Sequence, residues 1–154
     1  MKKLICAALA LVFCFAAAGC GEKVEEKAPF QSAETIQSLV EAQVFGYDMM
    51  ELDYTMLFQF EEGAVDAANS LVYYTVTGGG EIAAVITAAS AEKVAHVEQV
   101  LNDWVSATTT METGYRPAEV EKLEHAIMET RGTTVLLTVA ADWEAAAAVI
   151  AEIS

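Results

Sequence analysis

Hydrophobic and polar positions follow two periods along this chain, and the changes of period predict where the elements lie. Apolar residues recur at helical spacing from about Ser32 to Phe45, which predicts an amphipathic helix ended by Gly46. A second, shorter helix is predicted from about Tyr54 to Phe60, with Asp53 as its N-cap. Both helices precede the predicted strands.

Two hairpins come next, each made of β-branched and aromatic runs around a glycine turn. The first spans residues 70–88 and turns at Gly78-Gly79-Gly80, because glycine tolerates the positive φ angles of a tight turn. The second spans residues 123–140 and turns at Arg131-Gly132. Tyr73 and Tyr74 are adjacent on a strand and must point to opposite faces, so one of them is expected on an open outer face, as a contact surface or simply solvated.

A helix is predicted after each hairpin. Ser90 is expected to cap a helix that extends to about Ala107, followed by a polar exit loop at residues 108–114 and one helical turn at Pro117. The buried stripe of this helix is expected to contain Val94, Val97, Leu101, Trp104 and Val105.

Asp142 is expected to cap the last helix, which runs from Trp143 to about Ile153. Its inward residues are expected to be Trp143, Ala147 and Ile150.

The two halves of the chain also resemble each other. Residues 82–92 and 134–144 match at a constant offset of 52 and share Ala-Ala-(Ser/Asp)-x-Glu. A duplication explains the match, and so does the common pattern of a strand that leads into a helix. The predicted fold is α+β, with an antiparallel sheet of two hairpins in the order ββα-ββα, helices packed on one face, and N-terminal helices before it.

The first twenty residues have a different pattern, which predicts an export signal. Lys2 and Lys3 precede the uncharged apolar run 4–16, which is too short to cross about 30 Å of hydrocarbon. Ala17-Ala18-Gly19-Cys20 resembles the bacterial lipobox, and this resemblance implies cleavage before Cys20 and diacylation of its sulfur. Ordinary cleavage after Ala18 is the alternative, and it leaves Cys20 near the N-terminus as a free thiol.

The cysteines favour modification. Cys6 and Cys14 leave with the signal, so the mature chain keeps Cys20 without a disulfide partner. We therefore expect three segments: a lipoprotein signal peptide at residues 1–19, a lipidated Cys20 with a flexible tether at 20–31, and a single α+β domain at 32–154.

Charge and length exclude several classes of function. The net charge is −15 before removal of the two signal lysines, so nucleic acid and anionic lipid surfaces are not expected partners. The domain is too short for a two-lobed solute-binding lipoprotein. The expected partners are the membrane, through the lipid on Cys20, and an envelope protein.

No catalytic, cofactor-binding or metal-binding residue is predicted, and Cys20 is the one site residue that we expect. His96 and His125 lack the additional ligands that a zinc site needs. Glu61, Glu62 and Asp66 fall in one loop but lack the order of a calcium loop.

Several segments together resemble a family: the lipobox, Met50-Glu51-Leu52-Asp53, the strand from Glu81-Ile82-Ala83 with its following helix, Tyr115-x-Pro117, and the hairpin at Arg131-Gly132. They resemble small lipoproteins of clostridia-like Gram-positive bacteria that carry a C-terminal domain of unknown function. The resemblance implies an envelope location and supplies no activity.

The functional expectation is a lipid-anchored protein on the extracytoplasmic face of the cell membrane. We expect it to act as a non-catalytic binding or accessory module of the envelope. The alternatives are a small hydrolase that acts on envelope polymers and a purely structural surface lipoprotein.

Overall fold

The two central strands are apolar at consecutive positions, and this determines the architecture. β3 (Ile82–Thr87) reads Ile-Ala-Ala-Val-Ile-Thr, and its first five residues are buried. β5 (Thr134–Val139) is buried along its whole length. Successive side chains of a strand point to opposite faces, so both faces of this sheet must be covered. The computed structural model describes residues 27–154.

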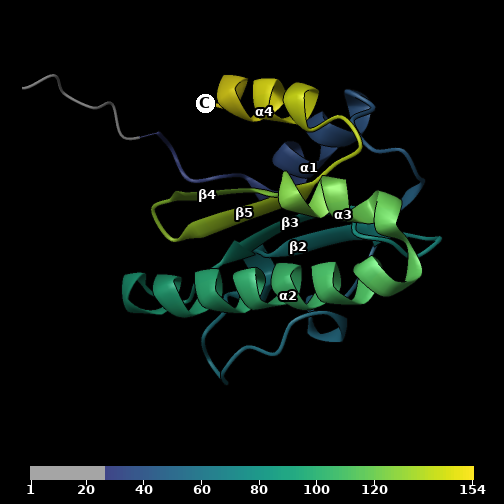
Figure 1. The fold of residues 1–154 in the computed structure, drawn as a ribbon. Coiled ribbons are helices and arrows are strands. Elements are labelled where there is room, and N and C mark those ends of the chain that lie inside the picture. The colour runs from purple at the N-terminus through teal and green to yellow at the C-terminus, as the bar shows by residue number, and fades with distance from the viewer. Residues whose placement is uncertain (1–26) are drawn as a thin grey trace, which may run out of the picture.

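Five strands form one antiparallel sheet in the order β1-β2-β3-β5-β4 (Figure 1). β1 (Met49–Glu51) and β4 (Ile127–Arg131) are the edges, and β2 (Leu71–Thr75) lies between β1 and β3. In the central pair, Ile82 lies opposite Val139 at one end and Thr87 lies opposite Thr134 at the other. The α+β class with an antiparallel sheet is as predicted.

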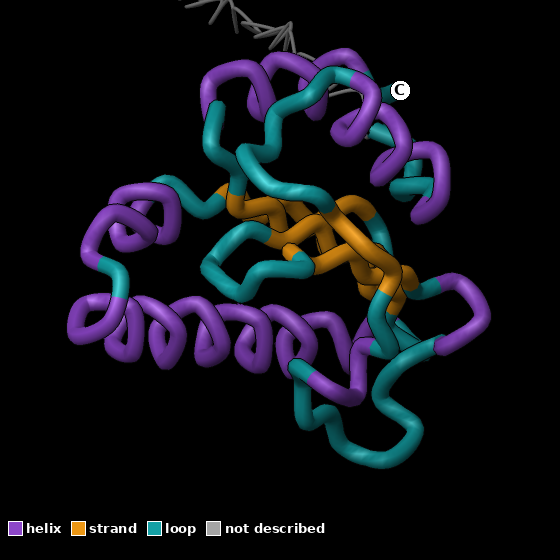
Figure 2. Tube along the Cα trace, turned by 90° about the vertical axis from the view of Figure 1, so that its right-hand side faces the viewer, coloured by secondary structure: helices purple, strands orange, loops and turns teal. Residues whose placement is uncertain are grey.

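Helices cover both faces of the sheet, so the prediction that they pack on one face is wrong (Figure 2). α2 (Val94–Tyr115) and α3 (Pro117–Glu124) pack with Ile82, Ala84 and Ile86 of β3. α1 (Ser32–Glu41) and α4 (Trp143–Glu152) pack with Ala83 and Val85 of the same strand. The physical reason is the continuous apolar run of β3, which leaves neither face polar enough for water.

Tyr73 and Tyr74 are correspondingly both half-buried, and the expected open outer face does not exist beside them. Tyr73 packs against the cluster under α1 and α4, and Tyr74 packs against the cluster under α2. The two rings do point to opposite faces, as the strand alternation requires.

The long helix differs most from its prediction. Residues 108–114, expected as a polar loop, continue α2 to Tyr115. Their hydroxyl groups are accommodated within the helix, since Thr109 and Thr113 each donate to a carbonyl one turn earlier, at 2.8 Å. The predicted stripe is correct: Val97 and Leu101 are buried, and its other three members pack partly buried against the same core.

Helix starts and ends differ in smaller ways. The predicted helix at 54–60 is a single 3₁₀ turn, Tyr54–Met56, and its Asp53 cap is confirmed by a bond from the Thr55 N–H at 2.9 Å. Ser90 makes no side-chain cap, and a 3₁₀ turn, Ala91–Lys93, precedes α2. Another 3₁₀ turn, Ala67–Asn69, precedes β2.

The ends of α1 and α4 complete these comparisons. α1 ends at Glu41, before the predicted Phe45, because Gln43 takes a left-handed φ of 56°. In α4 the Asp142 cap is confirmed by the bond that it accepts from the Ala145 N–H, at 2.9 Å. Its inward alanine is Ala146, whereas Ala147 is exposed.

The packed domain begins earlier in the chain than the predicted residue 32, because Phe30 is buried. The flexible tether was expected to extend to residue 31, yet the Phe30 side chain is 3% exposed and belongs to the cluster under α1 and α4. The packed domain therefore begins before Ser32. The signal peptide, Cys20 and the rest of the tether up to residue 26 lie outside the described residues. Within residues 27–154, no helix has the length and apolar character needed to cross a membrane.

Two glycines give a matched test of this packing. A Cβ at Gly80 would lie 2.8 Å from Leu123 Cγ, whereas a Cβ at Gly114, inside α2, meets nothing within 4 Å. We expect Gly80→Ala to lower the free energy of unfolding by about 1–3 kcal/mol through overpacking. Gly114→Ala should raise it by about 0.5–1 kcal/mol through helix propensity. Urea denaturation measures both, and equal effects at the two sites would contradict the packing described.

Candidate functional site

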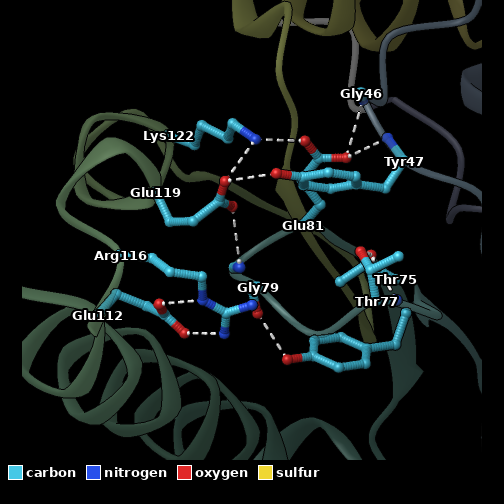
Figure 3. A network of polar contacts seen from close by, with 12 residues as sticks. Gly46, Tyr47, Thr75, Thr77, Gly79, Glu81, Glu112, Arg116, Glu119 and Lys122 are labelled. Carbon is cyan, nitrogen blue, oxygen red and sulfur yellow. Dashed lines mark hydrogen bonds and ion pairs between the residues drawn. The ribbon is translucent and has the colours of Figure 1, made fainter.

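Buried charged groups gather at the end of the sheet where the β2–β3 turn lies (Figure 3). We call Glu81, Glu119 and Lys122, together with the Gly46–Tyr47 segment, the carboxylate–lysine network. Glu81 directly precedes β3, and Glu119 and Lys122 share one face of α3. The side chain of Glu81 is fully buried, and Glu119 is 3% exposed.

Lys122 is the centre of the network. Its ammonium group donates to Glu81 Oε1 at 2.7 Å and to Glu119 Oε1 at 2.9 Å. The same Nζ lies 4.6 Å from the centre of the Tyr47 ring, within the range of a cation–π contact. One cation therefore neutralises part of the charge of two buried carboxylates.

Neutral donors make the other hydrogen bonds of the two carboxylates. Glu81 Oε2 accepts the backbone N–H groups of Gly46, at 2.9 Å, and of Tyr47, at 3.2 Å. Glu119 Oε2 accepts the Gly80 N–H at 3.3 Å, and its Oε1 accepts the Tyr47 hydroxyl at 3.1 Å. The network thus joins the segment after α1, the β2–β3 turn and α3.

A second ion pair lies next to the network. Arg116 donates through two nitrogens to the buried Glu112, at 2.8 and 2.6 Å, in a forked geometry. On the other side of the turn, the Tyr74 hydroxyl donates to the Gly79 carbonyl at 2.6 Å. Burial raises the pKa of Tyr74. The Arg116 guanidinium also lies beside the β2–β3 turn, since a Cβ at Gly78 would be 3.4 Å from Arg116 Nη1.

The pKa shifts of Glu119 and Lys122 favour the charged form of each group. Burial alone raises the pKa of Glu119, but hydrogen bonds from Lys122 and the Gly80 N–H outweigh it and hold the pKa below the ordinary 4.5. Burial alone lowers the pKa of Lys122, but its bonds to Glu81 and Glu119 raise the pKa above the ordinary 10.5. Both groups are therefore ionised at neutral pH.

This arrangement is suited to holding segments together. A general acid or base needs a pKa near the working pH and access to a substrate. Glu119 and Lys122 are instead shifted away from neutrality, and the network's carboxylates are buried. The chemistry that the geometry supports is structural, since it fixes three segments at one end of the sheet.

Surface hollows among residues 27–154 lie elsewhere, and four of them are lined by residues outside the network. The first, of about 300 Å³, separates the start of α1 from the end of α4. The second, of about 250 Å³, is mostly apolar and lies between α1 and β2. The other two, of about 400 and 330 Å³, are lined by residues 54–65 and by segments 51–54 and 67–72.

The two histidines hold neighbouring segments. His96 Nε2 accepts the Glu61 N–H at 3.1 Å and so joins the loop before β2 to α2. The His125 ring stacks on Trp143, with 4.1 Å between the ring centres. Sequence reasoning had left both without a site, and the structure gives each a packing role.

The acidic residues Glu61 and Asp66 of the loop before β2 accept hydrogen bonds from neighbouring protein groups. Glu61 accepts from Lys93 Nζ at 3.0 Å, and Asp66 accepts from the Ala68 N–H and the Asn69 side chain. Among residues 27–154, no three histidine, cysteine, aspartate or glutamate side chains gather in an arrangement that suits a metal ion.

Sequence reasoning did not find the network, although a weak signal for it exists. Glu119 and Lys122 are spaced i,i+3, and Glu112 and Arg116 are spaced i,i+4, so each pair shares a helix face. Such pairs are usually solvated. Only Glu81, next to a continuous apolar run, indicated that a charge enters the core.

Comparison with known proteins found no matching family model, no matching curated protein and no matching solved structure.

Proposed function

We propose that this protein is a lipid-anchored, non-catalytic binding or accessory module on the extracytoplasmic face of the cell membrane. We base the anchor on the resemblance of residues 17–20 to a lipobox and of several short segments to small lipoproteins of clostridia-like bacteria. Two acyl chains are needed for stable attachment, and a diacylated Cys20 supplies them. In this proposal the protein binds an envelope protein and catalyses no reaction on it.

The main observation in favour of a non-catalytic role is that the carboxylate oxygens of Glu81 and Glu119 all accept hydrogen bonds from other groups of the protein. One oxygen of each carboxylate accepts a bond from Lys122, and the other oxygen accepts backbone N–H groups. The Glu119 oxygen that Lys122 contacts also accepts the Tyr47 hydroxyl. A polymer hydrolase needs two carboxyl groups that face a substrate across an open cleft. The acids that this fold brings together face each other and a lysine instead.

The match between residues 82–92 and 134–144 has two possible origins, a duplication or a shared strand-to-helix pattern. The matched stretches supply β3 and β5, at the offset of 52 residues. However, the matched residues Ile82 and Thr134 lie on opposite faces of the sheet. Ile82 packs on the α2 face, and so does Val135, so the neighbouring Thr134 points to the other face. We therefore favour a shared strand-to-helix pattern over duplication as the origin of the match.

Crosslinking in living cells tests the proposed function, with Cys20→Ala as the matched variant. We expect the wild-type protein to sediment with membranes and to crosslink to one stoichiometric membrane partner. Cys20→Ala should release the protein from the membrane and lose that partner, while its circular dichroism stays unchanged. A membrane-bound protein without a partner, whose purified form cleaves envelope polymers, would contradict the proposal in favour of the hydrolase.

A further inference from the structure

Aromatic rings form much of the wall of one surface hollow, in the loop between β1 and β2. This hollow has a volume of about 400 Å³, and its lining includes Tyr54, Phe58 and Phe60. The centre of the Phe60 ring lies 5.9 Å from that of Tyr54 and 5.7 Å from that of Phe58, at interplanar angles of 58° and 48°. Three rings at different tilts therefore meet in one place, which we call the aromatic hollow.

Contacts with α2 and β3 hold the loop in place, so the aromatic hollow is already formed without a ligand. Phe58 is 2% exposed and makes a T-shaped contact with Trp104 of α2, with 5.8 Å between the ring centres. The Glu61 N–H donates to His96 of α2 at 3.1 Å. After the hollow, the chain returns to the end of β3 through a bridge at Val65. A preformed hollow of this kind binds a ligand without the cost of ordering a loop.

The rim of the aromatic hollow is acidic. Glu61 and Glu62 both line it, and both are exposed. Glu61 is paired with Lys93 at 3.0 Å, whereas Glu62 has no ion-pair or hydrogen-bond partner within residues 27–154. The lining contains no basic side chain, and the chain carries a formal charge of −15. The aromatic hollow thus combines ring faces with a negative charge that has no partner.

This combination suits a cation that needs no hydrogen-bond acceptors. The faces of tyrosine and phenylalanine rings attract a cation within about 6 Å of the ring centre. A primary ammonium group has three N–H donors to satisfy, and an aromatic wall offers few acceptors for them. A quaternary ammonium group keeps the positive charge but carries methyl groups in place of N–H groups. It can therefore leave water for an aromatic wall without losing hydrogen bonds.

We propose that the aromatic hollow binds a small solute with a quaternary ammonium group, such as choline. Tyr54 and Phe60 supply the ring faces, and Glu62 supplies the carboxylate. The solute carries a net positive charge, because the acidic rim and the charge of the whole chain oppose a carboxylate or phosphate on the same molecule. This site goes beyond the proposed role with an envelope protein, and it does not depend on the lipid anchor.

NMR titration with choline tests the site. The full chain is purified from its producing cells in a maltoside detergent, which has no ammonium group, and is studied at low salt. Two comparison ligands are used: the uncharged isostere of choline, in which a tert-butyl group replaces trimethylammonium, and glycine betaine, which adds a carboxylate. We expect choline to shift the backbone amides of residues 54–65 in a saturable way. The two comparison ligands should bind at least about fivefold more weakly.

Substitutions at the rings and at the rim separate the two contributions. Phe60→Leu keeps an apolar side chain but removes a ring face, so we expect choline binding to weaken about three- to tenfold. Tyr115→Leu is the matched control, because Tyr115 is 82% exposed at the far end of α2, and it should leave binding unchanged. Glu62→Gln should weaken binding about two- to fivefold, and less at high salt. Glu144→Gln, at an exposed position of α4, is the control for charge.

The proposal is overturned if no saturable shift occurs below about 10 mM choline, or if the shifts lie away from residues 54–65. Equal binding of choline and its uncharged isostere would also overturn it, because the hollow would then recognise apolar bulk and not charge. If Phe60→Leu does not fold, the isostere and the exposed Glu62→Gln still decide the question. A protein that carries no lipid can be titrated in the same way, so a failure of the anchor proposal is distinguishable from a failure of this one.

Discussion

Lys122→Met should destabilise the protein by about 3–5 kcal/mol, because it leaves two buried carboxylates without their cation. Methionine nearly matches the length of lysine, so lost packing contributes little. Glu81 has no solvent to replace the ammonium group, since its side chain is fully buried. Urea denaturation at neutral pH measures the loss of unfolding free energy.

The pH dependence gives this prediction a second signature. The pKa of Glu119 is lowered, so its contribution to stability is present above about pH 4.5 and is lost as the pH falls through the folded value. The pKa of Lys122 is raised, so its contribution is present below about pH 10.5 and is lost as the pH rises through the folded value. In Lys122→Met, protonation of the unpaired acids relieves the cost. The deficit relative to wild type should therefore shrink between pH 7 and about 4.5.

Lys93→Met is the matched control. Lys93 pairs with Glu61 at 3.0 Å, but both side chains are largely exposed, so the expected cost is about 0–1 kcal/mol. Lys122→Met combined with Glu81→Gln and Glu119→Gln should recover part of the loss, because no buried charge remains unpaired. A Lys122→Met protein no less stable than Lys93→Met would show that the network does not hold the fold.

Arg131→Met should cost about 2–4 kcal/mol, the second largest effect that we expect. The substitution removes two bonds to the last carbonyls of α4, a bond to Glu129 and the contact with the Phe30 ring. α4 has no basic residue in its own last turn, so Arg131 is the cation placed at its C-terminal end. Urea denaturation measures the loss, and hydrogen exchange should show faster opening of the last turn of α4 than of β5.

Arg131→Lys provides the comparison for this site. A lysine keeps the charge but lacks the planar fork that reaches several acceptors at once, so it should recover less than half of the loss. Full recovery by lysine would show that only the charge matters. A cost below about 0.5 kcal/mol for Arg131→Met, the range of ordinary surface changes, would contradict the role of these Arg131 contacts in holding α4 and Phe30 to the sheet.

The parts of the fold that local pattern determines were predictable. Glycine turns between β-branched runs indicated both hairpins, and the strands β2 with β3 and β4 with β5 pair as expected. Asp53 and Asp142 were recognised as caps because their chemistry is local. The stripe of α2 followed from helical spacing alone.

The parts that tertiary packing determines were not predictable in the same way. Threonines and a glycine between residues 108 and 114 suggested a loop, but burial of Thr108 and Glu112 keeps that segment helical. Arg131 is distant in sequence from Ile150, and Lys122 is distant from Glu81, so neither contact has a local signal. The covering of both faces was indicated by the apolar run of β3, which sequence reasoning assigned to a one-sided sheet.

The central claim is that the mature protein is anchored through a lipid on Cys20, and the mass of its N-terminal peptide tests this most directly. The protein is extracted from membranes of its producing cells with detergent, digested and analysed by mass spectrometry. We expect a peptide that begins at Cys20 and carries the mass of a diacylglyceryl group on the sulfur. A peptide that begins at Gly19 or Cys20 with an unmodified thiol, or an intact signal sequence, would contradict the account.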